Sequence, residues 1–239
     1  MDTKRNPKKD KQIDAARRIA TKNALDPHLL FSRASKDDLA NYTPEMLALS
    51  AEQARKALAG WDHNHALVLI EAVEGIEPAG TAVSVLTIVD RNQPFLYDSI
   101  MGEVTSSYRD LTLAVHPILH VENGKEPVFH PSDAPADPEH TVSLIQIHIP
   151  LLTAEQANDL EQRISKVLEQ VHLAIADWQS MLARLETAIT ELSAIPRKKT
   201  DRDEALAFLE WLRDDNFTFL GMREYTYSGN GADARFERA

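Results

Sequence analysis

Cysteine is absent from the 239-residue sequence, and glycine occurs only eight times. Without cysteine the chain has no disulfides, zinc–thiolate sites or catalytic thiolate, and this composition fits a reducing compartment such as the cytoplasm. Neither a G-x-G-x-x-G turn after a strand nor a P-loop is present, so the sequence carries no nucleotide-binding fingerprint. Its apolar runs fall well short of the roughly 20 residues of a membrane helix, so we expect no membrane partner.

Net positive charge is confined to one end of the chain. The overall charge is −11, but the first 22 residues contain eight Lys or Arg and three acidic residues, which by subtraction leaves −16 for the remainder. An acidic body repels phosphates, so we expect no nucleic-acid partner. The basic residues of this end are typical of a solvated, frayed terminus. They include Lys4, Arg5, Lys8, Lys9 and Lys11.

Residues 1–60 are predicted to be a basic tail and an N-terminal helical segment. Residues 10–24 are rich in Ala, Lys and Arg, and Asp26-Pro27 is expected to end them. Thr43-Pro44 then combines a capping hydroxyl with a proline at the first helical position, so the pattern predicts a helix over residues 44–59.

Residues 61–195 are predicted to form an α/β domain with an extra strand and a long helix. Residues 65–73 and 81–89 are β-branched and apolar and predict a hairpin, and a helix is expected over 95–109. Residues 111–121 and 141–149 predict two further strands. Neither face of these two strands is purely polar, so we expect helices to cover one face and another sheet, domain or subunit to cover the other.

A long helix is predicted after the last of these strands. Thr153-Ala154-Glu155-Gln156 matches a capping box, and neither Gly nor Pro occurs from 153 to 195. Every a and d position of a heptad begun at Ala157 is apolar, which predicts about 40 helical residues spanning about 60 Å. Such a helix would reach another domain or subunit, and the alternative is two helices that meet near His172.

Residues 196–239 are predicted to be a linker that leads toward a next domain. It would contain a short helix through Arg213 and a strand over 217–227, followed by a glycine-rich turn. Trp211, Phe217 and Phe219 are expected to build a core rather than to stack on a cofactor.

Several histidines could form a catalytic or metal site. His63 and His65 lie near a strand start, and the predicted strands carry His116, His120 and His148. Alternating histidines more often fill a half-buried sheet face, and no carboxylate cluster completes a ligand set, so we assign no metal residues. A triad from Ser99, His116 and Asp98 lacks a nucleophile elbow and an oxyanion hole, so we assign no catalytic residues. A stand-alone hydrolase or metal enzyme remains a third class, which predicts bound metal or turnover in the isolated chain.

The strand-to-helix connection that begins at Asp90 is the better candidate for a ligand site. The first turn of a helix has unpaired N–H groups and a positive dipole end, so it attracts carboxylates. Asp90 or Asn92 could cap the helix, although such residues also serve simply to make a turn. The candidate effector-binding residues are Asp90, Arg91, Asn92, Gln93, Pro94, Phe95 and Asp98.

Three blocks in this order carry a resemblance to a known family. The strand at 81–89 followed by Asp90 to Leu96 resembles the effector loop of ACT domains, which are amino-acid-sensing regulatory modules. The whole set, over about residues 30–227, is similar to the N-terminal region of the large NAD-specific bacterial glutamate dehydrogenases. The blocks are Ile88-Val89-Asp90 to Pro94-Phe95-Leu96-Tyr97-Asp98-Ser99, His116-Pro117-Ile118-Leu119, and Phe208-Leu209-Glu210-Trp211-Leu212 to Phe217-Thr218-Phe219-Leu220-Gly221 with Arg223-Glu224-Tyr225.

The resemblance and the strand order together imply an α+β, ferredoxin-like (ACT-like) antiparallel sheet with helices on one face, plus N-terminal helices and a long C-terminal helix. The resemblance implies that glutamate oxidation to 2-oxoglutarate and ammonia, with NAD, takes place elsewhere in a long chain. This fragment would then hold no cofactor and serve regulation and assembly. Its partners would be other domains of that chain, further copies in a homo-oligomer, and an amino-acid effector. The alternative is a free-standing amino-acid-sensing ACT module, although Phe95 stands where small ACT modules typically have glycine.

Overall fold

The computed structural model describes residues 7–122, 128–131, 140–195, 199–228 and 235–238. The chain divides into two compact units, Met1–Glu169 and Gln170–Ala239. In the described part, no helix has the length and apolar character needed to cross a membrane.

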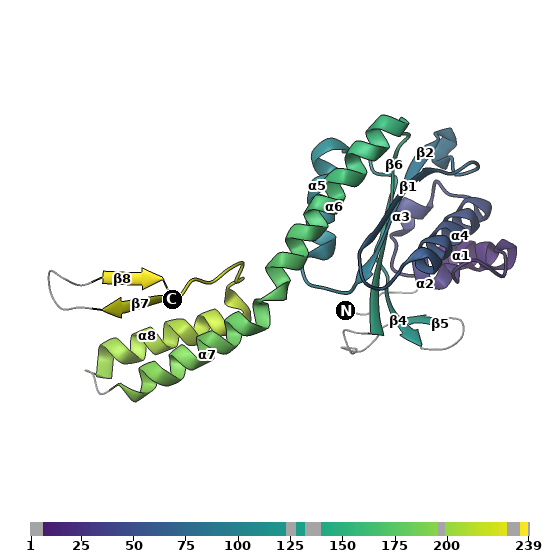
Figure 1. The fold of residues 1–239 in the computed structure, drawn as a ribbon. Helices are drawn as coiled ribbons and strands as arrows, with labels where there is room; N and C mark the ends of the chain where they lie inside the picture. Colours follow the sequence, from purple (N-terminus) through teal and green to yellow (C-terminus); the bar gives the residue numbers. More distant parts are fainter. Residues whose placement is uncertain (1–6, 123–127, 132–139, 196–198, 229–234, 239) are drawn as a thin grey trace. The chain divides into compact units, whose positions relative to one another are not determined.

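An antiparallel sheet forms the centre of the first unit (Figure 1). The strand order is β1-β2-β6-β4-β5, and β3 also pairs with β6. The strands are β1 Leu67–Ala72, β2 Val83–Arg91, β3 Leu113–Val115, β4 Ile118–Glu122, β5 Val128–Pro131 and β6 Thr141–Pro150. The predicted hairpin is confirmed, because β1 pairs with β2.

The sheet is ferredoxin-like with one change in chain order. In the ferredoxin-like order, strand-helix-strand-strand-helix-strand, the last strand returns to the edge beside the first. Here the first three strands of that order are β2, the interrupted strand β3–β4, and β6. The edge position beside β2, which the last strand would occupy, is occupied by β1. The α+β ferredoxin-like prediction is therefore confirmed, with an edge strand that precedes the others in the chain. Among the described residues, α6, the helix after β6, is not followed by a strand that returns to this sheet.

The strand predicted at 111–121 is divided into β3 and β4 by Pro117. Val115 lies opposite Gln146 and Ile118 lies opposite Ser143, so the register against β6 is the same on both sides. Proline has no backbone N–H to donate to the ladder, which accounts for the interruption. The carbonyl of Pro117 still accepts a bond from the N–H of Leu144 at 3.1 Å.

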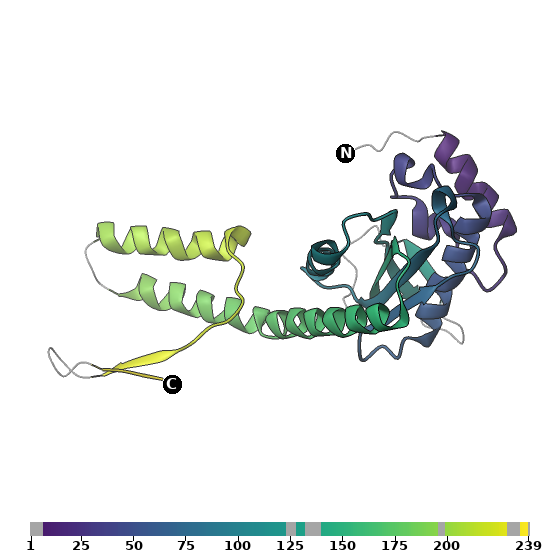
Figure 2. The same ribbon diagram turned by 90° about the horizontal axis from the view of Figure 1, so that it is seen from above.

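Helices cover both faces of the sheet (Figures 1 and 2). On one face α5 and α6 lie against pairs such as Leu86 with Ile147 and Ile88 with Ile145, all of which are fully buried. The N-terminal helices cover the other face, where Val85, Val89 and Leu144 share their core. These helices are α1 Pro7–Ile19, α2 Pro27–Phe31, α3 Lys36–Leu39 and α4 Pro44–Gly60, and the opposite layer consists of α5 Leu96–Ser107 and the first part of α6 Ala154–Ala176.

The second covered face corrects one prediction. We expected another sheet, domain or subunit on it, but α4 of the same chain packs there with Leu47, Ala51 and Ala54 fully buried. The predicted helix start is confirmed, since the hydroxyl of Thr43 accepts a bond from the N–H of Met46.

The basic N-terminal region is structured from Pro7 onward, which contradicts the predicted frayed terminus for these residues. In α1, Ile13 and Ala16 are fully buried. The ammonium of Lys9 donates to the carbonyls of Ser32 at 2.7 Å and Ala34 at 3.1 Å. Lys4 and Arg5 lie outside the described residues.

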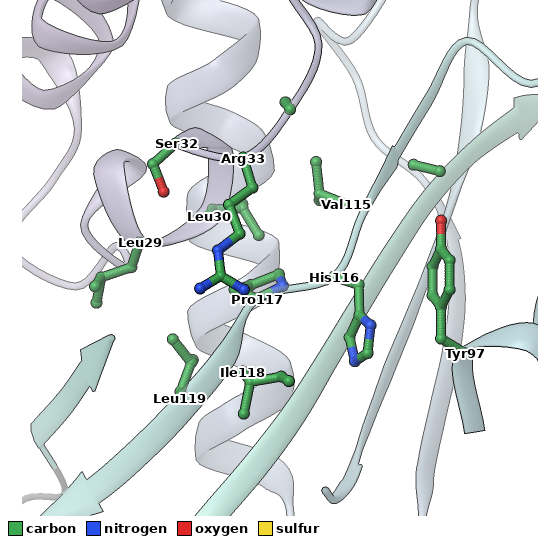
Figure 3. Close-up of a pocket in the computed structure, with 12 residues that line it drawn as sticks. Leu29, Leu30, Ser32, Arg33, Tyr97, Val115, His116, Pro117, Ile118 and Leu119 are labelled. Atoms are coloured by element: carbon green, nitrogen blue, oxygen red, sulfur yellow. The ribbon is translucent and has the colours of Figure 1, made fainter. Parts of the chain in front are cut away.

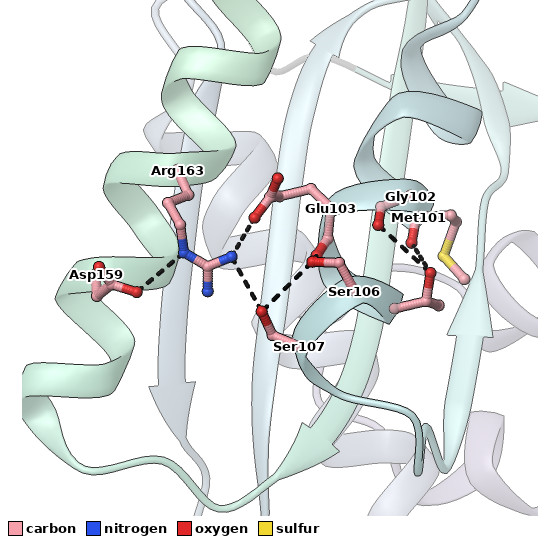
Figure 4. A network of polar contacts seen from close by, with 8 residues as sticks. Met101, Gly102, Glu103, Ser106, Ser107, Asp159 and Arg163 are labelled. Atoms are coloured by element: carbon pink, nitrogen blue, oxygen red, sulfur yellow. Dashed lines mark hydrogen bonds and ion pairs between the residues drawn. The ribbon is translucent and has the colours of Figure 1, made fainter.

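Polar contacts tie α6 to α5 at their exposed sides (Figure 4). The guanidinium of Arg163 on α6 bonds Asp159 on the same helix at 2.9 Å and reaches Glu103 and Ser107 on α5. The predicted capping box at the start of α6 is confirmed: Thr153 N–H donates to Oε1 of Gln156, and Gln156 N–H donates to the Thr153 hydroxyl.

The predicted long helix is present, with one interruption. It runs as α6 to Ala176 and as α7 Trp178–Ala194, and the two are separated by Asp177. The second unit also contains α8 Lys199–Trp211, which packs on α7, and a π-helical turn, η3 Leu212–Asn216. Its two strands, β7 Tyr225–Ser228 and β8 Arg235–Arg238, pair only with each other among the described residues.

The strand predicted over 217–227 is largely wrong. Residues 217–224 are not strand, and β7 begins only at Tyr225. The aromatic and β-branched residues that suggested a strand find no partner strand in the described part of the chain, and propensity alone does not form a strand without one.

Candidate functional site

The connection from β2 to α5 has an unusual backbone at Phe95. Its φ is +66° and its ψ is −8°, in the left-handed region that favours glycine. The Phe95 side chain is 47% exposed, while Leu96, the first residue of α5, is buried. The chain therefore retains the turn that a glycine would make at this place, although the residue is phenylalanine.

The predicted caps of this helix are not formed. Phe95 occupies the N-cap position, and its side chain makes no capping hydrogen bond. Asp90 is buried and its Oδ1 accepts a bond from the Arg91 N–H at 2.8 Å. Asn92 is held through its backbone, because its N–H donates to the carbonyl of Thr141 at 2.9 Å. These bonds of Asp90 and Asn92 thus stabilise the connection and do not cap the helix.

The other predicted loop residues lie on the surface or partly so. Arg91 is exposed and its guanidinium donates to the carbonyl of His63 at 3.1 Å. Pro94 and Asp98 are exposed, and Gln93 is half-buried. The seven candidate effector residues thus lie at the end of β2, in the connection and in the first turn of α5, and none of them lines the pocket described next.

A pocket of about 260 Å³ lies where the open side of β3 meets α2 and the residues after it (Figure 3). In Figure 3 the guanidinium of Arg33 points into it, and Tyr97 and His116 flank its other side. Most of its wall is aliphatic. The lining residues are Leu29, Leu30, Ser32, Arg33, Ala34, Tyr97, Ala114, Val115, His116, Pro117, Ile118 and Leu119.

The rings of His116 and Tyr97 are stacked. Their centroids are 4.9 Å apart and their planes differ by 8°. The Nε2 atom of His116 also forms a hydrogen bond with the hydroxyl of Ser143 on β6. These two contacts fix the imidazole plane at the junction of β3 and β4.

Burial and a neighbouring cation make His116 a neutral residue near pH 7. Burial, then the charge of Arg33, lowers the pKa of His116 to about 4, and Asp98 opposes this shift. The pKa of Tyr97 is raised by its partial burial and by the charges of Asp98 and Asp38. The site therefore presents one permanent cation beside two neutral aromatic rings.

His148 belongs to a different, buried network on the other face of the sheet. Its Nδ1 lies 2.9 Å from the hydroxyl of Tyr42, and its Nε2 lies 3.1 Å from the hydroxyl of Ser50. The Ser50 hydroxyl donates to Oε1 of Gln146 at 2.7 Å, and the Gln146 amide donates back to the Ser50 carbonyl. Complete burial lowers the pKa of His148 to about 3. Each side chain here is satisfied by a neighbour, so the network is structural.

The histidines are not brought together as a metal site would need. His116 and His148 lie on opposite faces of the sheet, and His120 is near His140, with ring centroids 6.1 Å apart. His63 packs on Trp61, and His65 bonds Asp62 at 3.2 Å in a surface loop. Within the described ranges, no three His, Cys, Asp or Glu side chains are grouped to hold a metal ion.

The hypothetical triad is not assembled either. His116 bonds Ser143 rather than Ser99. Arg33 and Ser143 had no recognisable signal in the sequence, because only the fold brings them beside Tyr97 and His116. Tyr97 and His116 were both within the blocks that carry the family resemblance.

Comparison with known proteins assigns the family. Residues 28–164, more than half of the chain, match the family model described as the glutamate dehydrogenase ACT1 domain. The chain belongs to this family. The matched region contains the whole sheet, α2 to α5, the pocket and the first part of α6.

Two curated relatives agree with the ACT1 assignment. The NAD-specific glutamate dehydrogenase of Halomonas elongata is 34% identical over 150 residues, which are 59% of this chain and 9% of that protein. The enzyme of the same name from Pseudomonas aeruginosa is 28% identical over 167 residues, 67% of this chain and 10% of that protein. The chain spans about a tenth of the length of the curated relatives it matches.

Proposed function

We propose that this chain is a non-catalytic regulatory and assembly region of a large NAD-dependent glutamate dehydrogenase. The parent enzyme would convert L-glutamate and NAD to 2-oxoglutarate, ammonia and NADH. Catalysis and NAD binding would belong to other domains of a long cytoplasmic polypeptide. The family match supports this proposal, and so do the names and the much greater length of the relatives.

The observation that carries the assembly role is the apolar surface of the second unit. Its exposed side chains include the block that resembles the large glutamate dehydrogenases. Most of the large apolar side chains that are exposed lie in this unit, and such a concentration usually marks a contact with another protein. The exposed residues are Phe208, Trp211, Phe217, Leu220, Met222, Tyr225, Tyr227 and Phe236.

Light scattering on the 239-residue chain tests the assembly role. We expect a dimer or larger species at micromolar concentration, and a shift toward monomer when Trp211→Ser and Leu220→Ser are combined. The matched control is Ile19→Ser with Leu151→Ser, which removes two exposed apolar side chains of the first unit. A chain that is monomeric at every concentration, or a control that dissociates equally, would contradict the proposal. Glutamate-dependent NADH formation by the isolated chain would contradict its non-catalytic part.

One observation favours a second candidate, a free-standing amino-acid-sensing ACT module. Phe95 holds the left-handed backbone that glycine would adopt, so the loop from Asp90 to Asp98 keeps the turn expected of an effector loop. Calorimetric titration with a panel of amino acids and NAD tests this candidate. Saturable amino-acid binding that is weakened by Asn92→Ala would support sensing at the loop. Absence of binding in a chain that self-associates would support assembly alone.

A further inference from the structure

We propose that the pocket beside Arg33 binds a small monocarboxylate with an apolar body and no ammonium group, such as an aliphatic 2-oxo acid. The site is formed by α2, the segment after it, β3, β4 and α5, and from the range Asp90 to Asp98 only Tyr97 lines it. It rests on the regulatory role proposed above and names the class of ligand.

The cation of the pocket is available to an anion. The Arg33 guanidinium points into the pocket in Figure 3 and makes no hydrogen bond or ion pair with any residue that the structure describes. Arginine presents a planar fork of donors that matches a carboxylate in a bidentate pair. A carboxylate placed there would also lie beside the imidazole of His116, which shares the pocket wall.

The wall and the volume define the rest of the ligand. Leu29, Leu30 and Ile118 are among the aliphatic side chains around Arg33. At about 30 Å³ per water molecule, the 260 Å³ of the pocket holds on the order of nine waters, or a ligand of roughly that many non-hydrogen atoms. Aliphatic 2-oxo acids with five or six carbons are of about this size.

The charges favour a 2-oxo acid over an amino acid. None of the lining residues is acidic, so the pocket has no carboxylate to pair with an α-ammonium. The charged groups that act on its aromatic wall are Arg33, Asp98 and Asp38, and both acids lie outside the lining. A second carboxylate on the ligand would face aliphatic side chains without a partner, so a dicarboxylate would also bind less well.

Calorimetry on the 239-residue chain with 4-methyl-2-oxopentanoate tests the proposal. We expect saturable binding that is about tenfold or more tighter than that of leucine, 2-oxoglutarate or acetate. Acetate isolates the contribution of the apolar wall, and leucine differs from the probe only at the α-carbon. A stronger response to leucine, or no binding of any of the four, would overturn the proposal.

Two variants place the binding at this pocket. Arg33→Met should weaken binding of the probe about tenfold or more, whereas Arg109→Met, an equal charge change at an exposed residue outside the pocket, should not. Ala114→Leu keeps the cation and fills the pocket, and it should weaken binding as well. Unchanged binding in both Arg33→Met and Ala114→Leu would overturn the site.

Nuclear magnetic resonance of the His116 imidazole gives an independent readout. The probe should shift the His116 ring resonances in the parent chain and in Arg109→Met, but not in Arg33→Met. Light scattering on the same samples separates the two proposals, because a monomeric chain that binds the probe would refute assembly and leave the pocket intact. An oligomer whose His116 resonances do not shift when the probe is added would refute ligand binding at the pocket and leave the assembly proposal intact.

Discussion

The hydroxyl of Tyr42 lies 2.9 Å from Nδ1 of His148, and this contact joins the N-terminal helical segment to the last strand of the sheet. The two residues are 106 positions apart in the sequence. The same hydroxyl lies 3.0 Å from Oγ1 of Thr112, just before β3. Three distant segments thus meet at one phenol group in the buried core.

Tyr42→Phe should therefore destabilise the first unit. The variant leaves a buried imidazole nitrogen and the Thr112 hydroxyl without this partner, which should lower the free energy of unfolding by about 1–3 kcal/mol. Urea denaturation measures the change. Tyr108→Phe is the matched control, because the Tyr108 hydroxyl has no hydrogen bond to a described residue, and its effect should stay within about 0.5 kcal/mol. Equal effects of the two variants would contradict the role given to Tyr42.

Acid should destabilise the fold through its buried histidines. His148 has a pKa of about 3 in the folded chain because it is fully buried, whereas an unfolded histidine titrates near pH ~6.5. Below that pH the unfolded state binds a proton that the folded state does not, so stability falls as the pH decreases. The slope from His148 alone approaches ~1.4 kcal/mol per pH unit.

His148→Asn tests this sign. The asparagine does not titrate and keeps a hydrogen-bonding amide near Tyr42. The pH slope of stability between roughly pH 6.5 and 5 should therefore decrease in the variant by the contribution of about one proton. Stability curves at several pH values check it. His116 should contribute to the remaining slope, because its pKa is also lowered, to about 4. A slope unchanged in the variant would show that His148 is not the group responsible.

Phe95 should respond to substitution according to its backbone rather than its side chain. A left-handed conformation disfavours L-residues by about 1–2 kcal/mol and β-branched ones most. Phe95 already carries such a cost, and the branched Cβ of valine increases it, so Phe95→Val should be destabilising by up to about 1–2 kcal/mol. Phe95→Gly should stay within about 1 kcal/mol of the parent, because relief of strain offsets the lost contact of a half-exposed ring and the added chain entropy. Thermal unfolding of the two variants compares them. A Phe95→Gly variant less stable than Phe95→Val would contradict the left-handed conformation and indicate an extended backbone at this position.

Apolar burial should hold α6 to the sheet more strongly than its ion pairs do. Ile164 is fully buried, and Ile164→Ala should lower the free energy of unfolding by about 2–5 kcal/mol. Arg163→Met removes the contacts to Glu103 and Asp159 shown in Figure 4. These contacts are partly exposed, so the variant should lower the free energy of unfolding by about 1 kcal/mol or less. Denaturant titration of the two variants compares them. A larger effect at Arg163 would mean that the polar cluster dominates the contact.

Features that depend on neighbouring residues could be predicted from the sequence. The Thr43 cap, the Thr153–Gln156 capping box and the β1–β2 hairpin were all confirmed. Each of these is a local pattern in which a few residues satisfy one another. The ferredoxin-like sheet followed from the order of such elements and from the family resemblance.

Features that depend on distant residues could not be predicted from the sequence. Helix α1 is mostly polar, and only its packing on α4 explains why Ile13 and Ala16 are buried. Likewise, Arg33 lies at the candidate pocket because α2 and the residues after it pack beside β3, and no local pattern indicates that. The predicted strand at 217–227 failed for the opposite reason, since its residues favour a strand but most of them lack a neighbour to pair with.

The early position of β1 in the chain has a consequence for biosynthesis. Every strand that the structure describes in the central sheet lies between Leu67 and Pro150, and no described residue after α6 adds a strand to it. A ribosome adds about 5–20 residues per second and domains fold from the N-terminal side first. In the usual ferredoxin-like order the sheet would have to wait, with an open edge, for a strand beyond the second helix. Here the nascent chain can close the edge beside β2 at once, so that edge is protected from mispairing while the residues after β6 are still being made.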